Sequence, residues 1–157
     1  MMALSCFNEN HNEACEIIKN KVFIDNKGSN VKKTLGTFEY SFYADPDKLE
    51  ELAAIMDKNK DFLLNLLNNT NLLEHESFTD MLWAVFHVGD ELRTRADLKG
   101  LSKTEIDHIS EDMRRAYTAM VMEWISYIVY LKNEYPFLYA IAIQKNPFYS
   151  TQLTKMA

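Results

Sequence analysis

Histidine and carboxylate side chains recur at helical spacing in one stretch, residues 72–92, LLEHESFTDMLWAVFHVGDEL. Imidazole nitrogens and carboxylate oxygens are the ligands that zinc, iron and manganese take in many proteins. The same groups also exchange protons in general acid–base catalysis. This stretch therefore supplies candidate metal ligands, which are His75, Glu76, Asp80, His87 and Glu91.

A helical projection of this stretch separates its polar and apolar side chains. At about 100° per residue, Glu76, Asp80, His87 and Glu91 fall within roughly 60° of one another. The opposite side carries Phe78, Met81, Leu82, Val85, Val88 and Leu92. Because metal sites in helical bundles are built in the core from facing helices, we interpret the polar stripe as a solvated face. Two alternatives stay open: an interface, and a metal site to which His108 from a neighbour could add a ligand.

A second pattern with metal-binding chemistry is Glu105-x-x-His108, the spacing found in carboxylate-bridged di-iron bundles. Such bundles need this motif twice and two further glutamates, whereas the sequence has one copy. The sequence contains no Gly-rich phosphate loop, nucleophile elbow or H-E-x-x-H motif. We therefore expect no catalytic residues and no cofactor, and the sequence leans away from an enzyme.

Composition narrows the class of protein further. The 157 residues fit one compact domain, and the net charge of −6 disfavours non-specific nucleic-acid binding. The spacing of Cys6 and Cys15 matches neither a zinc knuckle nor a CxxC pair, so both are read as reduced thiols of a cytoplasmic protein. The most apolar run, residues 119–131, is interrupted by Glu123 and is shorter than the about 20 residues of a membrane span. We expect no membrane insertion.

The elements that must position these side chains are mainly helices. Asp45 before Pro46 and the capping box Ser102–Glu105 mark helix starts, and Pro136 marks an end. We predict an antiparallel bundle at 45–148, with three long helices (45–67, 72–95 and 102–134) and a short one (136–145), followed by a tail at 149–157.

Residues 1–44 form an irregular N-terminal segment in this prediction. A short helix is expected at 12–24, and TFEYSFYA, residues 37–44, alternates at the strand period. A small β-hairpin pairing this stretch with 20–25 or 31–35 is compatible with the pattern, provided that it packs on the helices.

The helix at 102–134 has more apolar surface than one packing face needs. Its main stripe is Ile106, Ile109, Met113, Tyr117, Met120, Trp124, Ile128 and Leu131. Met122, Val129 and Tyr130 lie off this stripe, and Trp83 lies at the margin of the polar stripe of the preceding helix. We expect these four residues at an interface, covered by the N-terminal segment or, as the favoured alternative, by the second copy in a homodimer.

The stretch LLEHESFTDMLWAVFHVGDEL together with DHISEDMRRAYTAMVMEWISYIVYLKNEYPFLYAIAIQKNPF resembles a small helical domain of uncharacterised archaeal and bacterial proteins. The resemblance covers residues 70–148. Some of these domains accompany ion-channel segments as a cytoplasmic portion, so the resemblance implies a non-enzymatic module. It assigns no role to individual residues.

Together these observations predict a non-enzymatic helical interaction or regulatory module that forms a homodimer, with a different protein partner as a second option. The alternative is a metal- or small-ligand-binding bundle that uses the histidine and carboxylate stripe.

Overall fold

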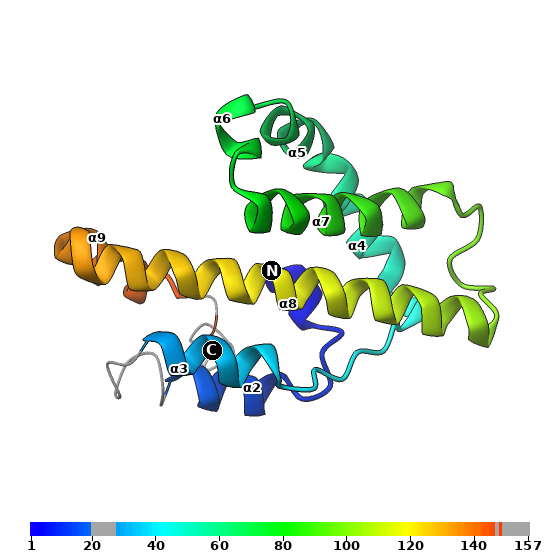
Figure 1. Ribbon diagram of the computed structural model, residues 1–157. Coiled ribbons are helices and arrows are strands. Elements are labelled where there is room, and N and C mark those ends of the chain that lie inside the picture. Colours follow the sequence, from blue (N-terminus) through cyan, green and yellow to red (C-terminus); the bar gives the residue numbers. More distant parts are fainter. Residues whose placement is uncertain (20–27, 147, 149–157) are drawn as a thin grey trace.

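The computed structural model describes residues 1–19, 28–146 and 148, and this part of the chain is mainly helical, as predicted. Figure 1 shows how its helices are arranged. Their bounds are α1 Met2–Ser5, α2 His11–Ile18, α3 Gly28–Gly36, α4 Pro46–Lys58, α5 Lys60–Leu67, α6 Thr70–Leu73, α7 Glu76–Thr94, α8 Lys103–Glu134 and α9 Pro136–Gln144.

Helix α8 is the centre of the fold and is covered on two sides (Figure 1). Antiparallel α7 packs along one side of α8 and in turn contacts α4 and α5. Helix α3 packs on the other side of α8, next to α2. This explains why the sequence of α8 is apolar on more than one face. Its fully buried side chains include Ile109, Met113, Tyr117, Ile125 and Ile128.

Local signals set both ends of α8. Ser102 Oγ accepts a hydrogen bond from the Glu105 backbone N–H at 3.4 Å, and Glu105 Oε2 accepts one from the Ser102 N–H at 2.9 Å. This is the predicted capping box. At the other end, Pro136 forces Tyr135 out of the helical conformation, so the chain bends there before α9 begins.

The N-terminal segment shares one core with the rest of the molecule. Leu4, Ile18 and Leu35 are fully buried in the same cluster as Met113 and Tyr117 of α8. Between α3 and α4 the chain runs in an extended conformation beside the residues that follow α1. The Glu9 N–H donates to the Ser41 carbonyl oxygen at 2.8 Å.

The predicted β-hairpin is not confirmed. Residues 31–35 form part of α3, so they cannot be its second strand, and residues 20–25 lie outside the described part. An isolated antiparallel bridge joins Asn8 and Phe42, and no strand longer than this occurs among the described residues. The alternation of Phe38, Tyr40 and Phe42 instead places aromatic rings against Tyr117, with centroid distances of 5.5 Å for Tyr40 and 5.2 Å for Phe42.

The predicted set of three long helices and a short one is wrong in detail. The first long helix is broken at Asn59, which ends α4 and precedes α5, and the second begins at Glu76 after the separate turn α6. The third long helix and the short last one occur as predicted. None of the helices within the described ranges is long and apolar enough to cross a membrane.

Candidate functional site

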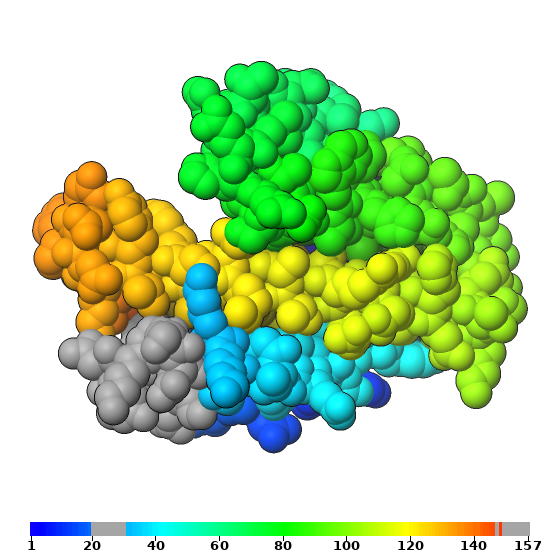
Figure 2. All heavy atoms as spheres, in the orientation of Figure 1, coloured from blue at the N-terminus to red at the C-terminus, as the bar shows by residue number. Residues whose placement is uncertain are grey.

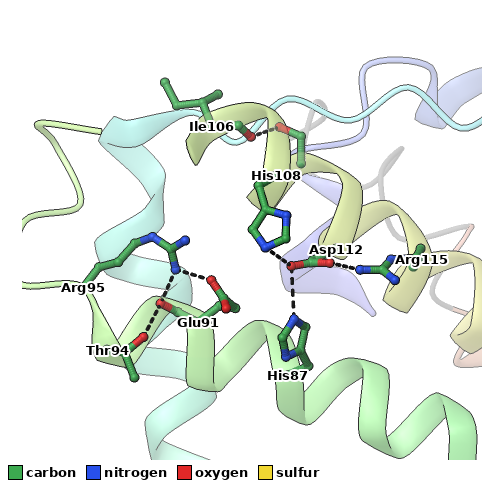
Figure 3. A network of polar contacts seen from close by, with 9 residues as sticks. His87, Glu91, Thr94, Arg95, Ile106, His108, Asp112 and Arg115 are labelled. Atoms are coloured by element: carbon green, nitrogen blue, oxygen red, sulfur yellow. Dashed lines mark hydrogen bonds and ion pairs between the residues drawn. The ribbon is translucent and has the colours of Figure 1, made fainter. Parts of the chain in front are cut away.

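Two histidines and an aspartate meet where α7 packs on the first half of α8 (Figure 3). His87 comes from α7, and His108 and Asp112 lie one turn apart on α8. Asp112 Oδ2 lies 3.3 Å from His87 Nε2 and 3.4 Å from His108 Nε2. The three potential ligand atoms all lie within 4.8 Å of one another.

Asp112 is the buried member of this cluster. Its side chain is only 2% exposed, whereas those of His87 and His108 are 51% and 54% exposed. Arg115, one turn further along α8, donates from Nη2 to Asp112 Oδ1. The two carboxylate oxygens are therefore used differently, because Oδ1 faces the guanidinium and Oδ2 faces the two imidazoles (Figure 3).

Glu91 lies next to the cluster but is held by a different partner. Arg95 Nη1 donates to Glu91 Oε2 and, at 2.7 Å, to the Glu91 carbonyl oxygen (Figure 3). This ion pair engages the Glu91 carboxylate near the end of α7, so the convergent donors are those of His87, His108 and Asp112.

The structure does not bring the five predicted metal ligands together. His75 is the residue before α7, Glu76 begins this helix, and Asp80 follows one turn later, all with exposed side chains. His87 joins the cluster about two turns from the end of α7. His108, considered in the sequence as a contribution from a neighbour, comes from the adjacent helix of the same chain.

Asp112 is the residue that the sequence reasoning missed. A usable signal was present, since His108 and Asp112 are four residues apart and so share one face of α8. Helices α7 and α8 are antiparallel and joined by a short connection, so residues at similar distances before and after this connection lie opposite one another. His87 therefore lies opposite His108 and Asp112.

The other half of the α7–α8 interface opens into an apolar groove of about 700 Å³. Figure 2 shows it as a notch between the green residues of α6 and α7 and the yellow and orange residues of α8 and α9. Apolar side chains line most of it, with polar His75 and Glu123 among them. Its lining includes Leu72, Phe78, Met81, Met120, Trp124, Tyr127 and Tyr130.

Helix α9 follows the end of α8 that borders this groove, but none of its residues lines the groove (Figure 2). It has no fully buried residue, although Tyr139, Ala142 and Ile143 are half-buried against the core. Phe137 is 77% exposed, and Leu138 and Ile141 are exposed as well. Tyr135 and Tyr130, whose rings lie 5.8 Å apart, continue this apolar surface to the end of α8.

The four predicted interface residues have different surroundings. Trp83 and Tyr130 are 55% and 52% exposed, and only Tyr130 lines the groove. Met122 and Val129 are half-buried and pack against the core of their own chain. Met122 reaches α3, since a Cβ atom placed on Gly36 would lie 3.7 Å from Met122 Cε.

A buried thiol lies next to an imidazole in the N-terminal part. Cys15 Sγ is 3.4 Å from His11 Nε2, and His11 Nδ1 is 3.3 Å from the Tyr117 hydroxyl. Burial raises the pKa of Cys15 and lowers the pKa of His11. These shifts favour a neutral thiol beside a neutral imidazole, which is the opposite of an activated nucleophile.

Comparisons with known proteins point to one family. The sequence model described as "Uncharacterized protein MJ1433, C-terminal helical domain" matches residues 1–144. The uncharacterised protein MJ1433 of the archaeon Methanocaldococcus jannaschii is 42% identical over 117 residues, which cover 74% of this chain and 47% of that protein. The chain thus spans about half the length of this relative. No solved structure matches. Neither description mentions an ion channel, so that association stays a prediction.

Proposed function

The chain belongs to the family of the MJ1433 C-terminal helical domain, and from this premise we propose that it is a non-enzymatic helical interaction module. It forms a homodimer in which α9 of each copy lies in the groove between α7 and α8 of the other. The observation that carries this proposal is the exposed apolar surface of α9 beside an apolar groove.

Helix α9 needs a partner on energetic grounds. A helix that is apolar all round is normally buried, yet Phe137, Leu138 and Ile141 all face solvent in the single chain. Full burial of such a side chain contributes roughly 1.5–3 kcal/mol. Docking of α9 would therefore supply a substantial part of the free energy of association.

The groove has the chemistry that an apolar helix requires. Phe78, Met81, Trp124 and Tyr127 offer aromatic and thioether surface, and methionine adapts its shape readily to different contacts. Laying an amphipathic or apolar helix into such a groove is a recurrent mode of protein recognition.

A second copy is the partner that the arrangement favours. The groove and α9 adjoin one another at the same end of one chain, where Tyr130 borders both. A two-fold axis at this end lets each chain provide one groove and one helix, so the same contact forms twice. Of the four residues predicted at the interface, this proposal keeps Tyr130 and adds the surface of α9 and the lining of the groove.

The test compares charge substitutions at two exposed places. In Phe137→Glu/Ile141→Glu the two carboxylates would have to enter the apolar groove, so we expect a monomer by light scattering. Helical content should remain that of wild type by circular dichroism, since neither side chain is buried in the chain itself. Tyr127→Glu, on the groove, should have the same effect.

Tyr43→Glu is the matched control. This tyrosine is also exposed, but it lies near the first half of α8, beside Asp107 and Arg114. The control should remain a dimer. If it dissociates as the α9 variant does, or if the α9 and groove variants stay dimeric, then α9 does not dock in the groove.

A further inference from the structure

We infer that His87, His108 and Asp112 form a binding site for one divalent transition-metal ion of the zinc class. The site lies at the opposite end of the α7–α8 pair from the groove, so it is independent of the proposed dimer contact. Its ligands come from two helices that belong to the same chain (Figure 3).

The surroundings of a buried carboxylate oxygen are the first observation that points to a ligand. Asp112 Oδ2 is shielded from solvent and accepts no well-aligned hydrogen bond from the described residues, although the Nε2 atoms of His87 and His108 lie 3.3 and 3.4 Å away. A buried carboxylate oxygen without an aligned donor is costly, and buried polar atoms nearly always have a partner. A cation placed between Asp112 Oδ2 and the two Nε2 atoms would supply this partner.

The distances fit a metal ion. Zinc binds nitrogen and oxygen at about 2.0–2.2 Å, so two ligands of a tetrahedral site lie roughly 3.3 Å apart. The separations of 3.3 and 3.4 Å from Asp112 Oδ2 to the two imidazoles already have this value. The potential ligand nitrogens of the two imidazoles lie no more than 4.8 Å apart, and rotation of these half-exposed rings can close this distance.

The donor set selects the class of metal. Two imidazoles and one carboxylate suit zinc and its neighbours in the transition series, whereas calcium and magnesium take oxygen ligands. Three protein ligands leave a fourth position for water. Arg115 acts as a positioning residue, because its bond to Oδ1 fixes the carboxylate with Oδ2 directed at the imidazoles.

The test is a titration of untagged, chelator-treated protein with Zn²⁺ by calorimetry. Wild type should bind one zinc ion per chain, and zinc should raise its Tm because an ion that binds only the folded state stabilises it. Cobalt(II) at the same site should give the visible absorption of a low-symmetry, four- or five-coordinate ion. A wild-type chain that binds no zinc stoichiometrically would overturn the inference.

Four variants locate the site. His87→Ala/His108→Ala should lose binding, with a fold intact by circular dichroism because both side chains are half-exposed. Asp112→Asn should lose it too, while Arg115→Gln should weaken it about 10–100-fold. His75→Ala, the exposed histidine before α7, should bind as wild type does. Undiminished zinc binding by the double-histidine variant or Asp112→Asn, or loss of binding in His75→Ala, would refute the assignment.

Discussion

Among single residues, burial distinguishes Asp112 from the other carboxylates of the polar stripe and of α8. Asp112 is buried because α7 covers the side of α8 on which it lies, and it takes its partners from both helices. Glu76 and Asp80 are of the same chemical class but face solvent. The apolar stripe predicted for the helix at 102–134 indicated neither the burial of Asp112 nor its contacts, because Asp112 lies off that stripe and is covered only when α7 packs there.

Tyr117 and Trp124 test where the core stripe of α8 lies. Tyr117 is fully buried, whereas Trp124 is half-buried on the groove and meets Phe148 at a centroid distance of 5.0 Å. Tyr117→Ala should lower the free energy of unfolding by about 3–5 kcal/mol, and Trp124→Ala by less, about 1–3 kcal/mol. Urea denaturation of both variants measures the difference. Equal losses would return Trp124 to the core, as the sequence predicted.

Tyr40 tests the cost of a buried hydroxyl. Its oxygen has no hydrogen-bond partner among the described residues, and burial raises its pKa above the ordinary 10.0, with the nearby Cys15 adding to the shift. The folded state therefore holds the phenolic proton more tightly than the unfolded state does. The stability that this provides is complete below pH 10 and falls as the pH rises above it.

Tyr40→Phe removes both effects. We expect unchanged or increased stability at pH 7, by up to about 1 kcal/mol, because the unpaired hydroxyl is no longer buried. Above pH 10 the variant should lose less stability than wild type. Urea denaturation at pH 7 and pH 11 measures both quantities. A marked loss at neutral pH would mean that the hydroxyl has a partner.

Among the helices, the strongest signals in the sequence are short-range, and they predict where three helices begin. The Asp45 cap, the Ser102–Glu105 box and Pro136 each act through neighbouring backbone groups, so α4, α8 and α9 begin where the sequence predicts. The break at Asn59 has no comparable signal. Helix α3 was missed because the sequence around Gly28 resembles a turn.

The capping box at the start of α8 can be tested by substituting Ser102. Ser102→Ala removes the acceptor for the Glu105 N–H and should destabilise the protein by about 1 kcal/mol at pH 7. Bonds from Ser102 lower the pKa of Glu105 below 4.5, so its contribution is complete above pH 4.5 and is lost as the pH falls. The difference between wild type and variant, measured by urea denaturation, should shrink below pH 4.5. A difference that does not change with pH would exclude the carboxylate from the cap.

At the scale of the whole molecule, α8 joins two layers, and this arrangement decides which apolar residues remain for a partner. Helices α2 and α3 cover one side of α8 and α7 covers the other. Most of the apolar surface that α8 carries beyond its main stripe is therefore covered within the chain (Figure 1). Packing between distant segments produces this result, and a wheel of one helix cannot predict it. Several exposed apolar side chains, those of Tyr130, Tyr135 and α9, gather at the C-terminal end of α8.

Substitutions at Met122 and Tyr130 distinguish a side chain that is covered within its own chain from one that lies at the dimer interface. Met122→Lys places a charge under α3 and should lower the free energy of unfolding by about 1–3 kcal/mol without changing the molar mass. Tyr130→Lys lies at the exposed end and should weaken the dimer while leaving the fold intact. Urea denaturation and light scattering on both variants give the two readouts. The opposite pattern would place the interface on the α3 side of α8.

The most direct test of the central claim is the molar mass of the wild-type chain as a function of concentration, measured by sedimentation equilibrium. If α9 docks reciprocally into the groove, the mass should rise to twice the 18.3 kDa of one chain and then level off, because a two-fold contact closes on itself. A mass that stays at one chain at every concentration would contradict the proposed function. So would a mass that continues to rise beyond two chains.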